Sequence, residues 1–149
     1  MQVLVATDGS ECSILALRGA RSFFPGSTIT VLAIVPLGAV SVAGAGQLMA
    51  EPYFADNRFE EEQADTAIAG AKDLYGHDPQ VSYFKVTGDP GATIVSQAAE
   101  RHSDVIVVGT HGRKFLERLL VGSVATYVVN HATCPVFVMR DKPAPSKPL

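Results

Sequence analysis

The stretch Asp104-Val105-Ile106-Val107-Val108-Gly109-Thr110-His111-Gly112 is followed, after nine residues, by Gly122-Ser123. Its first five residues are typical of a buried β-strand, and residues 124–129 are typical of a helix. Glycine where a strand ends and a helix begins lets the backbone approach a ligand, because no Cβ is in the way. The first turn of a helix also has unpaired N–H groups and a partial positive charge, which attract phosphate. The spacing therefore predicts a phosphate site, with two unrelated turns as the alternative.

Segments typical of strands and helices alternate along the whole chain. Apolar or β-branched runs predict strands at residues 1–6, 28–35, 81–86, 105–108 and 135–140. Helical spacing and end signals predict helices at residues 11–24, 57–75, 90–101 and 123–131, with Ser10 and Asp89 as N-caps. Because the inner strands are almost continuously apolar, they suit a parallel sheet with helices on both faces. We expect an α/β fold: a doubly wound three-layer α/β/α sandwich with a five-stranded parallel sheet.

The helical spacing also predicts which side chains face the sheet. In the first helix these are Ile14, Leu17, Ala20 and Phe24. In the second helix they are Phe59, Ala64, Ala67, Ile68, Ala71 and Leu74. The acids of the second helix's first turn, Glu60, Glu61 and Glu62, favour the helix dipole, and we interpret them as a solvated face rather than as metal ligands.

The composition of the chain limits the classes of protein to which it can belong. The chain has 149 residues, of which 47% are hydrophobic and 18% charged, which is typical of one globular domain. A net charge of −3 argues against a general nucleic-acid or membrane-surface binder. Cys12 and Cys134 have no metal-like spacing, and no signal peptide is evident, so we expect reduced, buried thiols in a cytoplasmic protein.

Two segments fall outside the regular pattern. Residues 36–50 carry no charge and are too few to span a bilayer, so we expect a loop. Residues 142–149 contain three prolines, so we expect a disordered tail after a domain at 1–141.

In a doubly wound sheet, ligands bind beyond the carboxyl ends of the strands, where the strand order reverses. If the first and fourth strands are neighbours there, Thr7 and Asp8 face Gly109 and Gly112 across one cleft. The loop after Gly112 contains three cations and a single acid, a balance that suits a polyphosphate. The cations are Arg113, Lys114 and Arg118.

Individual residues admit more than one role. Ser123 either binds a phosphate oxygen or caps its helix, and the two roles are compatible. Asp8 would repel phosphate, so it suits a ribose hydroxyl, a base N–H or the organisation of its own loop. His111 is interpreted as a solvated loop histidine or a phosphate donor. No catalytic triad, nucleophile elbow or metal-binding spacing is present in the sequence, so we assign no catalytic and no metal-binding residue.

These residues resemble the universal stress protein family, in its single-domain form, from Val3 to Arg140. The motif of glycine, two residues, glycine, nine residues, glycine and serine resembles the ATP-binding branch of that family. One departure is Ala33, where the family commonly has a histidine. The other matching segments are residues 6–10, 32–35, 88–90, 120–125 and 134–138.

The resemblance implies the strand order 3-2-1-4-5 and roles for matching residues. Asp8 and the backbone of Ile34 would surround adenine and ribose, with Ala6 and Thr7 as the floor of the site. The ribose and phosphates of ATP, with or without Mg²⁺, would contact Val108, Gly109, Gly112, Gly122, Ser123, Val124 and Ala125, with Arg113 among the loop cations. The resemblance also implies a homodimer through the last strand, at Val136 and Val138. Partners would then be an adenine nucleotide and a second copy, with no nucleic acid and no membrane.

The leading interpretation is a nucleotide-dependent stress or regulatory protein with at most slow ATP hydrolysis, because no general base is evident. The alternatives are an adenylating or nucleotide-hydrolysing enzyme, a phosphoacceptor domain and a non-nucleotide interaction module. The phosphoacceptor interpretation needs an aspartate where the third strand ends in Lys85-Val86-Thr87. The stress signal, the downstream partner and the preference among AMP, ADP and ATP are not evident from the sequence.

Overall fold

The computed structural model describes residues 1–37, 57–111 and 121–140. All nine predicted elements are present in these ranges, with ends within two residues of those predicted. In order they are β1 (Gln2–Ala6), α1 (Glu11–Phe23), β2 (Thr28–Pro36), α2 (Arg58–Tyr75), β3 (Val81–Gly88), α3 (Pro90–Glu100), β4 (Val105–Gly109), α4 (Ser123–His131) and β5 (Val136–Met139). Most of the predicted loop at 36–50 and the predicted tail at 142–149 lie outside the described residues.

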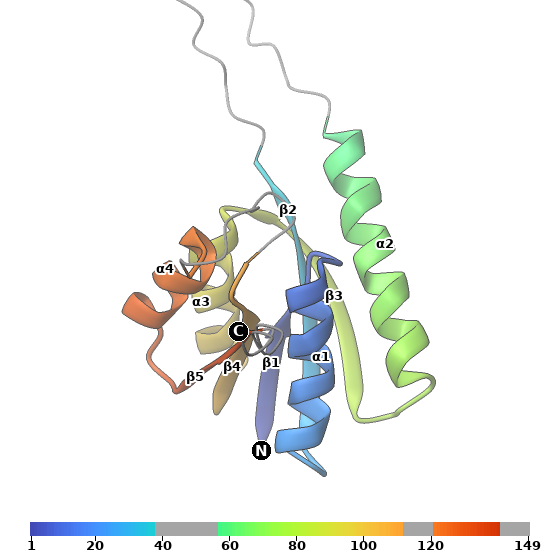
Figure 1. Cartoon of the computed structure of the whole chain (residues 1–149), viewed down its shortest axis with the longest axis vertical. Helices are drawn as coiled ribbons and strands as arrows, with labels where there is room; N and C mark the ends of the chain where they lie inside the picture. The colour runs from blue at the N-terminus through green and yellow to red at the C-terminus, as the bar shows by residue number, and fades with distance from the viewer. Residues whose placement is uncertain (38–56, 112–120, 141–149) are drawn as a thin grey trace, which may run out of the picture.

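The five strands form one parallel sheet in the order β3-β2-β1-β4-β5, as predicted. Figure 1 shows α1 and α2 on one face of this sheet and α3 and α4 on the other. The strand order reverses between β1 and β4, which are neighbours at the centre. This confirms the doubly wound three-layer sandwich and places the expected ligand cleft between β1 and β4.

Alternate side chains of each inner strand belong to opposite faces of the sheet. In β1, Val3 and Val5 pack in the apolar cluster that contains Leu17 of α1. Leu4, between them, packs in the cluster that contains Ile94 of α3 and Val128 of α4. Burial on both faces explains why these strands are apolar at every position rather than at every second one.

The predicted inner faces of α1 and α2 are partly wrong. Ile14, Phe59 and Leu74 are exposed large hydrophobic residues rather than core residues. The residues of α1 that are buried include small ones, Ser13, Ala16, Gly19 and Ala20. Small side chains let the helix axis come close to the sheet, so the packed face of α1 combines Leu17 with small residues and leaves Ile14 outside it.

Hydrogen bonding and an ion pair hold α2 against α1. The hydroxyl of Tyr75 in α2 donates to the backbone carbonyl of Leu17, and Arg21 pairs with Asp78 just beyond α2. Burial, opposed in part by the Arg21 charge, raises the pKa of Tyr75 to about 12. The Tyr75 hydroxyl therefore stays protonated and able to donate at physiological pH.

The prediction that the two cysteines are not joined in a disulfide is confirmed, and the prediction that they are buried is wrong. Cys12 and Cys134 are both free thiols, but each is half-buried rather than buried. Burial raises the pKa of the Cys134 thiol, so that thiol is protonated at neutral pH. The Thr110 hydroxyl lies 3.7 Å from Sγ of Cys12.

The end of β4 packs directly against the first turn of α1. A Cβ added at Gly109 would lie 2.7 Å from the backbone carbon and oxygen of Cys12. Backbone atoms cannot move aside as the end of a flexible side chain can. A residue without a Cβ is therefore required at this point for α1 to reach its observed position.

We predict that Gly109→Ala lowers the free energy of unfolding by about 1–3 kcal/mol, because overpacking here displaces backbone. The matched control is Gly70→Ala in the middle of α2, where an added Cβ meets nothing within 4 Å. That control should be neutral or stabilising by up to about 1 kcal/mol. Urea unfolding of both variants measures the difference, and equal midpoints would refute the packing argument.

Candidate functional site

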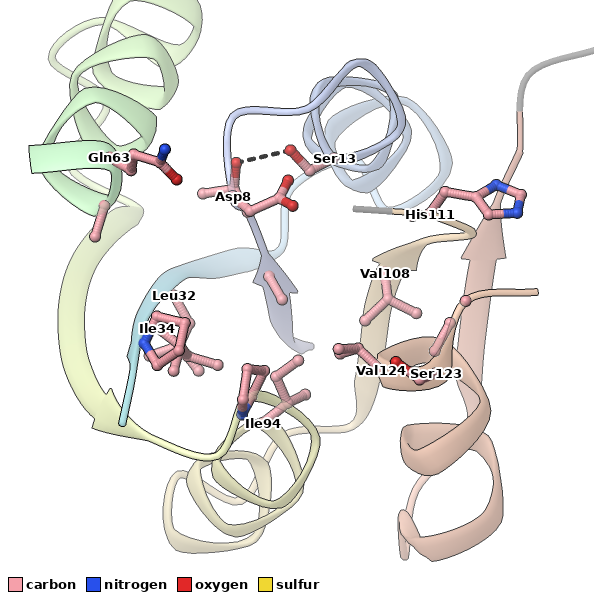
Figure 2. A pocket seen from close by; sticks show the side chains of 18 of the residues that line it. Asp8, Ser13, Leu32, Ile34, Gln63, Ile94, Val108, His111, Ser123 and Val124 are labelled. Atoms are coloured by element: carbon pink, nitrogen blue, oxygen red, sulfur yellow. Dashed lines mark hydrogen bonds between the residues drawn. The ribbon is translucent and has the colours of Figure 1, made fainter. Parts of the chain in front are cut away.

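A cavity of about 580 Å³ lies at the carboxyl end of the sheet. It is lined by the ends of β1, β2 and β4 and by the first turns of α2, α3 and α4. Figure 2 shows Leu32, Ile34, Ile94 and Val108 as apolar walls around one space, with Asp8 at one end and Ser123 at the other. The volume is within the range of small-ligand sites.

Ten of the predicted site residues line this single cavity. They come from four segments far apart in the sequence: Ala6, Thr7, Asp8, Ile34, Val108, Gly109, Gly122, Ser123, Val124 and Ala125. The predicted Gly112 and Arg113 lie outside the described residues, as do Lys114 and Arg118. The convergence of Thr7 and Asp8 with Gly109, which was argued from topology, is therefore confirmed as geometry, whereas the convergence with Gly112 is untested.

Sequence reasoning missed the part of the wall that α2 provides. Phe59, Glu60 and Gln63 line the cavity, as do His111 and, from α3, Pro90 and Ile94. The glycine spacing contains no information about α2, and the apolar pattern assigned Phe59 to the core.

An opening in the sheet forms one end of the cavity. β2 continues to Pro36, whereas its partner β1 ends at Ala6, opposite Leu32. The N–H of Thr7 donates to the carbonyl of Leu32 at 2.9 Å, and the register pairs no β1 residue with the rest of β2. Backbone groups of a parallel strand point alternately to its two neighbours. The N–H and C=O of Ile34 therefore point toward the position that β1 has vacated.

The loop after β1 is organised by its own side chains. The buried hydroxyl of Thr7 lies 3.1 Å from that of Ser13 and accepts from the N–H of Gly9. A carboxylate oxygen of Asp8 accepts from the N–H of Ser10 at 2.9 Å. One of the predicted roles of Asp8, loop organisation, is thus confirmed. Asp8 also lines the cavity, which leaves its role toward a ligand open.

The first turn of α4 differs electrostatically from those of the other three helices described. α1 has a Ser10 side-chain cap and Glu11, α2 has Glu60 and Glu61, and α3 has an Asp89 side-chain cap. In α4 the cap position makes no side-chain hydrogen bond and the first turn contains no acid. The partial positive charge of this helix is therefore neither capped by a side chain nor offset by a first-turn acid at the cavity wall.

The N-cap of α4 is Gly122 rather than Ser123, so the predicted capping role of Ser123 is wrong. The N–H of Gly122 donates to the carbonyl of Thr110 at 2.6 Å, and an added Cβ would lie 2.8 Å from that oxygen. The sequence suggested that Gly109 and Gly122 are glycines so that a ligand can come close. The structure gives a different reason for both. At both positions the missing Cβ makes room for the protein's own backbone, which in turn positions the helix beside the cavity.

Within residues 1–37, 57–111 and 121–140, no group of three or more His, Cys, Asp or Glu residues could hold a metal ion. In the same ranges no helix has the length and apolar character needed to cross a membrane.

Comparison with known proteins identifies the family. The family model described as "Universal stress protein family" matches residues 1–140. The chain belongs to the universal stress protein family. A universal stress protein of Methanocaldococcus jannaschii is 29% identical over 144 residues, which cover 93% of this chain and 81% of that protein.

Solved structures of universal stress proteins share the fold. UspA of Lactobacillus plantarum superposes with a TM-score of 0.69 at 27% identity, covering 94% of this chain and 97% of that one. A universal stress protein in complex with cAMP gives 0.61 at 21% identity, covering 93% and 96%. An Arabidopsis thaliana member with AMP bound gives 0.57 at 18% identity, covering 95% and 92%.

Proposed function

We propose that this universal stress protein binds an adenine nucleotide, with ATP as its ligand, and acts as a nucleotide-dependent regulator in the stress response. The observation that carries the proposal is the pairing of two features in one cavity: the unpaired backbone of Ile34 at one end and the first turn of α4 at the other. The complexes of two structural neighbours with cAMP and AMP agree with this class of ligand.

The backbone of Ile34 suits adenine. It offers an N–H donor and a C=O acceptor side by side in the plane of the sheet, beyond the last rung of β1. The edge of adenine has a ring-nitrogen acceptor next to an amino donor, which is the complementary pattern. Because backbone atoms make this contact, it does not need the histidine that the family commonly has at the position of Ala33. One flat face of the base would then lie against apolar side chains such as Ile94 and Leu32, and the other would be directed to Ala64 of α2.

The first turn of α4 suits the phosphates. The N–H groups of Ser123, Val124 and Ala125 have no partner within the helix, and no first-turn acid opposes an anion there. Asp8 lies at the other end of the cavity (Figure 2), and Glu60 of α2 also lines the cavity; both carboxylates would repel phosphate. Charge therefore favours one orientation of the nucleotide. In this orientation Asp8 receives the ribose, Ala6 and Thr7 form the floor, and the phosphates contact Val108, Gly109, Gly112, Arg113 and Gly122.

Magnesium is proposed only as a companion of the triphosphate, because Mg²⁺ commonly binds through substrate phosphates. Hydrolysis is proposed to be slow at most, since the carboxylate of Asp8 lies at the end of the cavity away from Ser123 (Figure 2). The two free thiols agree with a reducing, cytoplasmic setting.

We predict that the protein binds ATP at least about tenfold more tightly than GTP. At the corresponding edge guanine places a ring N–H donor against the Ile34 N–H and a carbonyl acceptor against its C=O, so two polar groups are left unpaired. Isothermal titration with the two triphosphates, at equal ionic strength and Mg²⁺, measures the ratio. Equal affinities would contradict the backbone readout of adenine.

We predict that Ser123→Pro weakens ATP binding by about tenfold, because it removes a charge-assisted hydrogen bond from one phosphate-facing N–H. Proline suits the first position of a helix, and Gly122 before it has the extended backbone (ψ 160°) that precedes proline, so the fold should be retained. Ser123→Ala is the matched control, since it keeps the N–H and loses only the hydroxyl. If Ser123→Pro melts like the wild type and binds ATP equally well, the phosphates are not at α4.

We also propose that two copies pair through β5. It is an edge strand whose residues are only half-buried. Bonds from β4 reach the carbonyls of Pro135 and Met139, so by alternation the backbone groups of Val136 and Val138 point away from the sheet. Two such edges related by a twofold axis could form an antiparallel pair.

Val138→Pro removes an outward N–H while leaving the bonds to β4, so we predict a folded monomer where the wild type sediments as a dimer. Val138→Ala keeps the N–H and should remain dimeric. Sedimentation equilibrium at tens of micromolar distinguishes the outcomes. A monomeric wild type, or a dimeric Val138→Pro variant, would contradict pairing through this edge.

A further inference from the structure

The first two turns of α2 form a wall of the cavity that no part of the glycine motif accounts for. Phe59, Glu60, Gln63 and Ala64 all line it. Residues four apart lie on the same side of a helix, so Phe59 and Gln63 form one column facing the cavity, with Phe59 one turn nearer the start of α2.

Phe59 is unusual among the apolar residues of this wall. Its side chain is 65% exposed, and it belongs to none of the apolar clusters formed by the described residues. It therefore contributes little to the core, yet it places an aromatic ring at the cavity. An aromatic face beside a site for a flat heterocycle is suited to stacking, which every base permits because every base has a π-face.

Gln63 has an available polar group at the same place. Its side chain is half-buried, and its carboxamide makes no hydrogen bond among residues 1–37, 57–111 and 121–140. Figure 2 shows Gln63 and Asp8 together at one end of the cavity, away from Ser123 and Val124. A carboxamide donates as well as accepts, whereas the carboxylate of Asp8 only accepts.

The orientation of the base follows from the backbone of Ile34. Its N–H and C=O lie in the plane of the sheet, so a base bound to them continues that plane where β1 has ended. One face of the base is then directed to α3, where Ile94 lines the cavity, and the other to α2, where Ala64 does. Phe59 and Gln63 are on the α2 side.

We propose that α2 is the specificity wall of the nucleotide site: Phe59 packs on the base, and the carboxamide of Gln63 binds the ribose 2′-hydroxyl that Asp8 shares. The inference rests on the proposed binding of adenine nucleotides and adds to it the side chains that read the nucleoside. Glu60, in the same wall, keeps the phosphates at the α4 end by repulsion.

The test for Phe59 is Phe59→Ala, titrated with ATP in the calorimeter. We expect affinity to fall about tenfold, the effect of removing one base-stacking aromatic ring, with an unchanged melting temperature. Leu74→Ala is the matched control, because Leu74 is an exposed apolar residue on the same helix that does not line the cavity. It should bind ATP as the wild type does.

The test for Gln63 is Gln63→Leu, titrated with ATP and with 2′-deoxy-ATP. We expect the wild type to prefer ATP and Gln63→Leu to reduce that preference by about fivefold, the effect of one hydrogen bond, because Asp8 still accepts from the 2′-hydroxyl. Phe59→Ala should lower both affinities together and keep their ratio. Phe59→Ala thus changes the affinity for both nucleotides, whereas Gln63→Leu changes the ratio of the two affinities.

The outcomes separate this inference from the function on which it rests. A wild type that binds no ATP overturns both. A wild type that binds ATP, with Phe59→Ala and Gln63→Leu each matching it for both nucleotides, overturns the α2 wall and leaves the proposed function standing. Lower affinity in Phe59→Ala and a reduced ATP preference in Gln63→Leu support it.

Discussion

The cavity depends on how closely two helices approach the end of β4. The first turn of α1 lies against Gly109, and the start of α4 is hydrogen bonded to Thr110 through Gly122. Neither position has room for a Cβ. This backbone packing places the uncapped first turn of α4 at one side of the site and leaves the β1–α1 loop at the other. Gly109 and Gly122 therefore fix the positions of the elements that line the cavity.

The second constraint is the unequal length of neighbouring strands. Because β1 ends at Ala6 while β2 continues to Pro36, the sheet contains a vacant position at its centre, bordered by the backbone of Ile34. A flat ligand with complementary polar groups can replace the missing strand.

Much of this arrangement was predictable from the sequence. Alternating elements and continuously apolar strands predict the doubly wound parallel sheet, and the family resemblance implies the strand order that brings Asp8 and Gly109 together. The helix faces were less predictable, because close packing selects small residues such as Ala16 over Ile14. Gly122 rather than Ser123 is the N-cap of α4, a difference of one residue. Hydrophobic periodicity does not locate the start of a helix to within one residue. The wall from α2 depends on where the start of that helix lies relative to the sheet. No spacing in the sequence indicates that a single residue such as Gln63 lines the cavity.

The central claim is that one ligand contacts the backbone of Ile34 and the first turn of α4 at the same time. The most direct measurement is a titration of ¹⁵N-labelled protein with ATP, followed by amide chemical shifts. The account predicts that the amides of Ile34, Val124 and Ala125 change together, at one shared dissociation constant, and more than amides on the outer face of α2 or α3. Saturable binding of ATP that leaves these three amides unmoved would contradict it.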